Sequence, residues 1–209
     1  MTDEQGAGRP LRRLRLALWI FVGIVAAGGV ILAVVSPSKV ARDAPSISAG
    51  AGIGGPFTLT AADGSVLTDQ RLKGRPFAIF FGFTRCPDVC PTSLARMAKL
   101  RKQLGADGDK FDIVFVSVDP GHDTPADIGS YVGLFGTPIV GATGTADQLA
   151  RIEQEYGVYV RKVPIEGGDY TIDHTAAIFL MDRDGRFVTT IDYHENDRTA
   201  LKKLRRIVA

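Results

Sequence analysis

Residues 77–91 read FAIFFGFTRCPDVCP, and this stretch decides how the chain folds. Its first seven residues form a continuous apolar run, which predicts a strand buried on both faces of a sheet. The two cysteines of the chain, Cys86 and Cys90, follow directly, and a helical pattern begins at about Thr92. The sequence therefore predicts a strand, a thiol-bearing loop and a helix in direct succession.

Strand and helix signals alternate through the rest of the chain. Further strands are expected at 57–60, 66–67, 111–118, 139–142, 159–163, 176–181 and 187–191. Helices are expected at about 92–104, 125–135, 146–156 and 198–208. This order predicts an α/β domain with a central mixed sheet. The thiol motif follows a long buried strand and directly precedes the N-terminus of a helix, so we expect the domain to be thioredoxin-like.

The expected helix ends rest on local signals. Thr124 is a typical capping residue, Pro125 suits a first helical position, and Asp127 completes a capping box. Gly105 and Gly157 follow the last apolar residues of two helices, where glycine is common. These signals predict the start of the helix at 125–135 and the ends of the helices at 92–104 and 146–156.

The N-terminal part of the chain predicts a membrane anchor. Residues 16–35, LALWIFVGIVAAGGVILAVV, contain no charged side chain, and a helix of this length would cross a hydrocarbon layer of about 30 Å. Four arginines precede this segment, at positions 9, 12, 13 and 15, whereas only Lys39 and Arg42 follow it closely. The positive-inside bias therefore predicts a short cytoplasmic N-terminus, residues 1–15, and a single-pass protein of the bacterial cytoplasmic membrane with its remainder on the periplasmic side.

A cleaved signal peptide is the alternative for this segment. Such a peptide usually has an apolar region of about 7 to 15 residues and ends in a small-x-small site. Candidate sites at 46–48 and 49–51 lie late, so an uncleaved anchor is favoured. A mitochondrial targeting sequence is disfavoured because the segment before the apolar run is short and carries Asp3 and Glu4.

Composition separates a linker from the globular domain. Residues 36–55 are rich in Ser, Pro, Gly and Ala, which predicts a flexible linker before a domain at residues 56–209. The chain of 209 residues has 25 basic and 23 acidic side chains, a formal net charge of +2. It lacks a long basic run, so nucleic acid is not expected as a partner.

Cys86, Cys90 and His174 are the candidate metal ligands. Residues four apart on a helix share one face, so the two sulfur atoms can converge on one ion or close a disulfide. The N-terminal amides of the following helix would favour thiolates. His174 lies where an extended stretch is expected to begin, and Asp173 beside it is a candidate acceptor for the imidazole proton.

This ligand set suits copper better than other common metals. Thiolate ligands select Cu(I), and imidazole also suits copper. Two thiolates and one neutral imidazole leave Cu(I) with a net charge of −1, whereas Cu(II) remains an alternative. Structural zinc would need a fourth protein ligand, for which His122 and His194 are candidates, although neither has a spacing that demands it.

Redox chemistry is the competing function for the same cysteines. A thiol–disulfide oxidoreductase needs an attacking thiolate and a resolving partner, which Cys86 and Cys90 could supply. Three residues separate the two cysteines, instead of two, and this spacing counts against a general thiol–disulfide oxidoreductase. A peroxiredoxin-like peroxidase is disfavoured because Thr84 lies two residues before Cys86, where that class is expected to carry Thr or Ser three residues before its reactive cysteine.

Three motifs resemble the Sco/SenC family: FTRCPDVCP at 83–91, VSVDP at 116–120 with DTP at 123–125, and DHT at 173–175. The resemblance covers the chain from about Pro56 onward and includes the single membrane anchor. The cysteine motif with the downstream Asp-His is highly specific, and the Asp-Pro motif is supporting. Gly121-His122 departs from the charged or larger pair more common in the family.

This resemblance implies a fold, a ligand set and a role. The fold would be thioredoxin-like, and Cys86, Cys90 and His174 would bind one copper ion. The family helps to assemble the dinuclear copper centre of cytochrome c oxidase subunit II, as a metallochaperone or as a thiol reductase. The resemblance thus implies subunit II as a partner, together with a protein that donates copper.

Overall fold

The computed structural model describes Trp19 and residues 52–209, and the elements below lie in the second range. The expected membrane anchor at residues 16–35 lies outside the described residues, apart from Trp19. In the described part of the chain, no helix combines the length and the apolar character needed to cross a membrane. The segment boundaries expected near residues 15, 35 and 55 therefore stay predictions.

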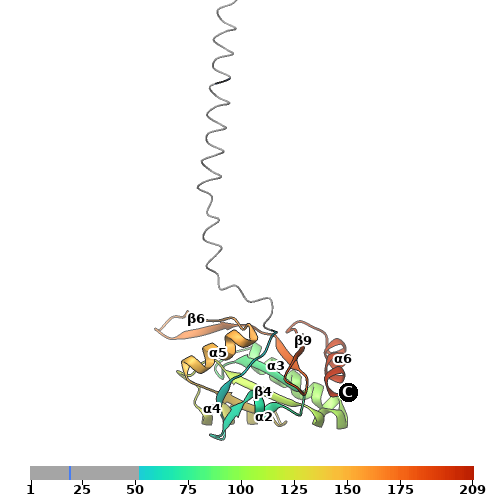
Figure 1. Ribbon diagram of the computed structural model, residues 1–209. Coiled ribbons are helices and arrows are strands. Elements are labelled where there is room, and N and C mark those ends of the chain that lie inside the picture. Colours follow the sequence, from blue (N-terminus) through green and yellow to red (C-terminus); the bar gives the residue numbers. More distant parts are fainter. Residues whose placement is uncertain (1–18, 20–51) are drawn as a thin grey trace, which may run out of the picture. The chain divides into compact units, whose positions relative to one another are not determined.

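A seven-stranded mixed sheet forms the centre of the domain (Figure 1). Strand β3, Phe77–Gly82, runs parallel to β4, Asp112–Ser117, which runs parallel to β5, Val140–Thr143. The antiparallel strands are β1, Thr58–Ala61, β2, Val66–Thr68, β8, Ile178–Met181, and β9, Phe187–Ile191. The strand order is β2-β1-β5-β4-β3-β8-β9, which confirms the predicted α/β architecture with a central mixed sheet.

The two central strands are buried as their sequences predict. All six residues of β3 are buried, and so are five of the six in β4. A continuous apolar run without alternation suits a strand that is covered on both faces. Phe80, Phe81 and Phe115 have at most 1% of their surface exposed and belong to the hydrophobic core.

Helices connect the strands, and their caps follow the sequence signals. Thr124 accepts a hydrogen bond from the Asp127 amide, and the Asp127 carboxylate accepts one from the Thr124 amide. Gly157, which ends α5, has a φ of 63° in the left-handed region that glycine favours. The helices are α2, Asp69–Leu72, α3, Val89–Gln103, the 3-10 helix η2, Gly105–Lys110, α4, Pro125–Gly133, α5, Ala146–Tyr156, and α6, Asp197–Val208.

Helix α3 differs from its prediction at the N-terminal end. It begins at Val89, three residues before the expected start at Thr92, so Cys90 and Pro91 lie in its first turn. Proline is tolerated there because the amides of the first turn have no partner within the helix. The short elements α2 and η2 were not predicted, because four to six residues carry too little periodicity to be recognised.

A separate two-stranded sheet carries His174. Strands β6, Val160–Pro164, and β7, Tyr170–His174, pair antiparallel with Val160 opposite His174. The expectation that an extended stretch begins at His174 was wrong, because His174 is the last residue of β7. The dipeptide Gly167-Gly168 between two alternating runs is the local signal for this hairpin.

Candidate metal centre

The loop between β3 and α3 is held in place by a buried carboxylate. Asp123 is 2% exposed and accepts hydrogen bonds from the Thr84 amide at 2.8 Å and the Thr84 hydroxyl at 2.6 Å. Ser117, at the end of β4, donates its hydroxyl to the same carboxylate at 2.5 Å. The start of the cysteine loop is thereby attached to the end of the neighbouring strand.

The structure brings together the three ligands that the sequence predicted. One ligand atom from each of Cys86, Cys90 and His174 lies within 4.8 Å of the other two. His174 Nε2 is 3.4 Å from Cys90 Sγ, and the Cys90 amide donates to Cys86 Sγ at 3.4 Å. Because α3 begins at Val89, Cys86 lies before the helix and Cys90 in its first turn.

The two thiols have different environments. Cys86 is partly buried, whereas Cys90 is fully buried. The hydrogen bond from the Cys90 thiol lowers the pKa of Cys86 to about 4. Hydrogen bonding to Cys86 and burial raise the pKa of Cys90. At neutral pH the metal-free pair therefore holds one thiolate, on Cys86, and one thiol, on Cys90.

The imidazole of His174 is oriented by its own strand end and by aromatic rings. Its Nδ1 lies 3.1 Å from the Thr175 carbonyl oxygen, an acceptor that keeps the proton on Nδ1 and leaves the Nε2 lone pair directed at the cysteines. The rings of Phe80 and Phe83 pack edge-to-face against the imidazole, with distances of 5.9 and 6.0 Å between ring centroids. Asp173, the expected acceptor, instead pairs with Arg161 at 2.8 Å, because adjacent residues of a strand point to opposite faces.

The other candidate histidines do not join the cluster. Among the described residues, the group of potential metal ligands at this site comprises the two cysteines and His174 alone. His122 Nδ1 instead lies 3.0 Å from Asp119, and the ring of His194 packs against Tyr193 at 5.0 Å. Neither histidine therefore supplies the fourth ligand that structural zinc would need.

The donor set fits a soft metal ion. Two sulfur atoms and one imidazole nitrogen converge beside aromatic side chains, in a site whose deepest ligand is fully buried. Soft thiolate ligands select Cu(I) over hard ions such as Mg²⁺ or Ca²⁺. A three-ligand set without a carboxylate therefore fits copper better than zinc, calcium or magnesium.

Comparison with known proteins identifies the family. A model of the SCO1/SenC family matches residues 46–209. The chain belongs to the SCO1/SenC family. Among solved structures, it resembles Bradyrhizobium japonicum ScoI with copper bound, at 47% identity and a TM-score of 0.69 over 75% of this chain and 99% of that one. Yeast Sco1 with copper bound gives 33% identity and a TM-score of 0.69 over 75% of this chain and 88% of that one.

Curated members of the family are similar at a comparable level. The human protein SCO1 homolog, mitochondrial, is 38% identical over 139 residues, which are 65% of this chain and 46% of the relative. Protein SCO2, mitochondrial, of Saccharomyces cerevisiae is 35% identical over 157 residues, which are 73% of this chain and 52% of the relative. The match spans about half the length of these relatives. The predicted thioredoxin-like domain agrees with the Sco structures.

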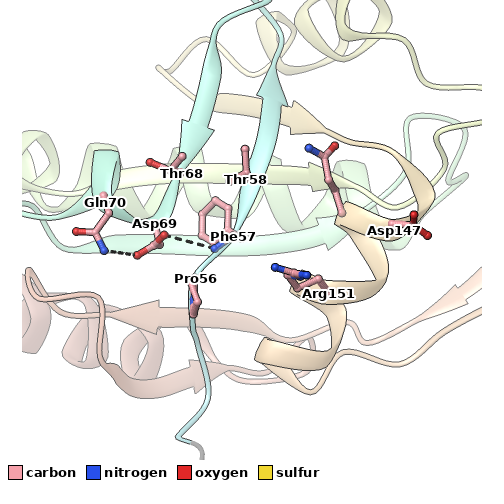
Figure 2. Close-up of a pocket in the computed structure, with 9 residues that line it drawn as sticks. Pro56, Phe57, Thr58, Thr68, Asp69, Gln70, Asp147 and Arg151 are labelled. Carbon is pink, nitrogen blue, oxygen red and sulfur yellow. Dashed lines mark hydrogen bonds between the residues drawn. The ribbon is translucent and has the colours of Figure 1, made fainter.

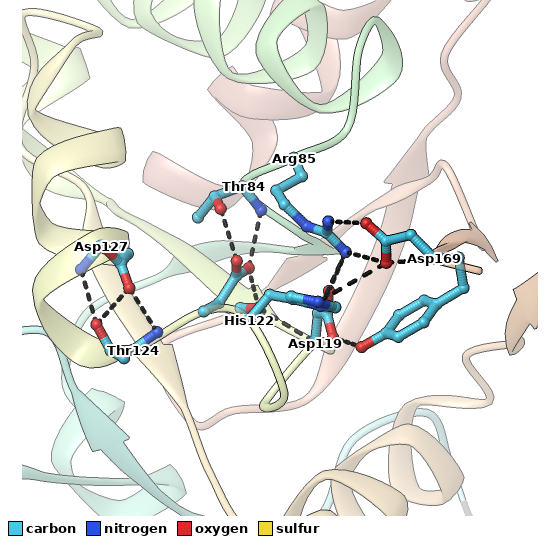
Figure 3. A network of polar contacts seen from close by, with 10 residues as sticks. Thr84, Arg85, Asp119, His122, Thr124, Asp127 and Asp169 are labelled. Atoms are coloured by element: carbon cyan, nitrogen blue, oxygen red, sulfur yellow. Dashed lines mark hydrogen bonds and ion pairs between the residues drawn. The ribbon is translucent and has the colours of Figure 1, made fainter. Parts of the chain in front are cut away.

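Sequence reasoning missed a polar cluster beside the cysteines. Asp119, which belongs to the supporting Asp-Pro motif, is fully buried and accepts a hydrogen bond from the Tyr170 hydroxyl. Arg85 and Asp169 pair next to it (Figure 3). The signals in the sequence were an acid at the end of a buried strand and an arginine inside the cysteine motif, whereas Asp169 belongs to no recognisable motif.

A pocket lies away from the candidate metal centre. An open pocket of about 570 Å³ lies between α5 and the β1–β2 edge (Figure 2). In it, the Asp69 carboxylate accepts hydrogen bonds from the Phe57 amide at 3.4 Å and the Gln70 amide group at 2.7 Å. The nine residues that line this pocket include neither cysteine nor histidine, so it is separate from the candidate metal centre.

Proposed function

We propose that this protein is a membrane-anchored copper metallochaperone for the dinuclear copper centre of cytochrome c oxidase subunit II. The observation that carries the proposal is the convergence of Cys86, Cys90 and His174, from parts of the chain 84 residues apart. The copper-bound relatives from Bradyrhizobium japonicum and yeast support copper as the ion. The resemblance to Sco/SenC proteins supports subunit II as the recipient.

The three side chains would hold copper as cargo. Cys86 is ionised at neutral pH, because its pKa is lowered to about 4, and is ready to bind a cation. Cys90 must lose its proton on binding, so loading releases protons and becomes weaker at low pH. Neutral His174 adds a nitrogen ligand without charge. Because Cys86 is only partly buried, a partner's ligands can reach the ion from its side of the site.

Copper titration of the reduced full-length chain tests the proposal. Removing one of three ligands in Cys86→Ala or His174→Ala should weaken copper binding at least about tenfold, the lower end of the losses seen even for outer-shell changes. His194→Ala is the matched control, because its ring packs on Tyr193. X-ray absorption of the loaded protein should count two sulfur atoms and one nitrogen. Full affinity in both ligand variants would refute the proposal.

The anchor and the compartment belong to the same proposal. Residues 16–35 would hold residues 56–209 at the periplasmic face of the cytoplasmic membrane, joined by the linker at residues 36–55. Protease treatment of spheroplasts should degrade the domain while the membrane stays intact. Protection of the domain from protease, or its release from membranes by alkaline carbonate, would contradict this topology.

Thiol–disulfide exchange is the second candidate function. The observation that favours it is the asymmetry of the pair, with a thiolate on partly exposed Cys86 and a thiol on buried Cys90. Such a pair can supply the attacking and the resolving sulfur. His174→Ala separates the two functions, because it should weaken copper binding at least about tenfold but spare thiol exchange. If oxidase maturation also survives in that variant, reduction of the recipient is the function.

A further inference from the structure

The hairpin that carries His174 is not part of the central sheet. Strands β6 and β7 pair only with each other, and neither joins the seven-stranded sheet that carries the cysteine loop. Residues 175–177 connect His174 to β8, which pairs with β3, but β6 and β7 themselves have no partner strand in that sheet. Side-chain contacts between the hairpin and the cysteine loop can therefore contribute to the position of His174.

Two polar contacts connect the start of β7 to the cysteine loop and to the end of β4. Arg85, the residue before Cys86, donates from Nη1 to Asp169 at 2.7 Å (Figure 3). The Tyr170 hydroxyl donates to Asp119 at 2.5 Å. Arg85 also reaches Asp119, at 3.6 Å, so the guanidinium connects the Asp169 and Asp119 carboxylates.

The strand geometry relates these contacts to the candidate ligand. Tyr170, Ile172 and His174 alternate along β7 and so point to one face, and Ile172 is 5% exposed. Four residues of strand span about 13 Å. The face that packs on the domain is thus attached through Tyr170 at one end and presents His174 to the cysteines at the other.

Burial decides which of the contacts matters most. The Arg85 and Asp169 side chains are 37% and 44% exposed, and an exposed ion pair alone contributes little. Asp119 is 0% exposed, and a buried carboxylate needs hydrogen-bond donors or a cation. Tyr170 and Arg85 meet that need, as does His122, whose ring packs on Tyr170 at 4.9 Å. The hydrogen bond from Arg85 also lowers the pKa of Asp169 to about 2.

We infer that Arg85, Asp119, Asp169 and Tyr170 are positioning residues, a clamp that fixes the hairpin so that His174 meets the cysteine pair before a metal arrives. The inference rests on the proposed function, because the benefit of the clamp is a preformed copper site. None of the four residues belongs to the predicted ligand set; they act through the placement of His174. Outer-shell residues of this kind typically change metal affinity about 10- to 100-fold.

The test is a double-mutant cycle on copper affinity of the reduced full-length chain. Arg85→Gln and Tyr170→Phe should each weaken copper binding about tenfold in the native background. In the His174→Ala background, the same changes should have no further effect, because the clamp acts through the imidazole. Arg161→Gln is the matched control, since it breaks the Arg161–Asp173 pair within the hairpin and leaves the clamp intact. An equal loss with and without His174, or in the control, would overturn the inference.

A measurement without copper separates failure of the clamp from failure of the proposed function. In the metal-free protein, amide hydrogen exchange of residues 170–174 should be faster in Arg85→Gln and Tyr170→Phe than in the native chain or in Arg161→Gln. Unchanged exchange in both clamp variants would overturn the inference. If the native chain binds no copper, the proposed function fails, and hydrogen exchange alone then decides whether the clamp exists.

Discussion

Cys90 Sγ and His174 Nε2 lie 3.4 Å apart, although 84 residues separate them in the chain. Cys90 is in the first turn of α3, and His174 is the last residue of a hairpin that stands apart from the central sheet. An ion bound between them would join the two parts of the domain. The candidate metal centre therefore depends on a long-range contact as much as on the spacing of the two cysteines.

Cys86 should be reactive at unusually low pH. In the metal-free, reduced protein, its rate of alkylation by iodoacetamide should rise with a midpoint near pH 4 and stay high to neutral pH, because the thiolate is the nucleophile and its pKa is about 4. Cys90→Ala removes the thiol that donates to Cys86, so the midpoint should move up toward the ordinary value of 9.0. A midpoint near 9 in the native protein would contradict the assignment of the thiolate.

Oxidation should prevent copper loading. A disulfide between Cys86 and Cys90 removes both thiolates, so titration of the oxidised chain should give an affinity at least about a hundredfold below that of the reduced chain. Reduction with a phosphine should restore binding, which serves as the control for damage. Equal copper binding by the two forms would show that the cysteines are dispensable.

Gly82→Ala should displace the buried thiol of Cys90 and destabilise the domain. A Cβ atom at Gly82 would lie 2.6 Å from Cys90 Sγ and 3.1 Å from the Phe115 ring, so the buried thiol has to move. We expect a loss of about 2 kcal/mol in the free energy of unfolding, measured by urea denaturation, together with weaker copper binding. Gly133→Ala is the control: its Cβ meets nothing within 4 Å, and the helical position should gain up to about 1 kcal/mol. Similar results for both variants would contradict the close contact.

Asp123→Ala should detach the cysteine loop from β4. The change leaves the amide and hydroxyl of Thr84 and the hydroxyl of Ser117 without their acceptor in a buried site. We expect destabilisation by about 3 kcal/mol in urea denaturation of the metal-free protein. Asp184→Ala removes an exposed carboxylate paired with Arg186 and should change stability by less than about 0.5 kcal/mol. A loss below 1 kcal/mol for Asp123→Ala would show that water replaces the carboxylate.

Local patterns were sufficient for much of the fold. The apolar run at 77–83 predicted β3 because a strand covered on both faces has no polar alternation. Thr124 marked a helix start because its side chain accepts a hydrogen bond from a free amide of the first turn. Gly157 marked a helix end because glycine readily adopts the left-handed conformation found there. Strand β7 was missed, since five residues of mixed polarity resemble a loop unless the hairpin turn before them is recognised.

The chain's own order of residues determined the buried strand, the thiol pair at its end and the choice of a soft metal, because these depend on side-chain chemistry and on spacings of a few residues. Tertiary structure alone decided how closely His174 approaches the sulfur atoms, that the Thr175 carbonyl and not the Asp173 carboxylate accepts the hydrogen bond from the imidazole, and that Asp119 is buried and bonded to Tyr170. These relationships join segments tens of residues apart, or depend on which way a strand residue points. Packing of the hairpin against the domain settles them, and no local pattern records that packing.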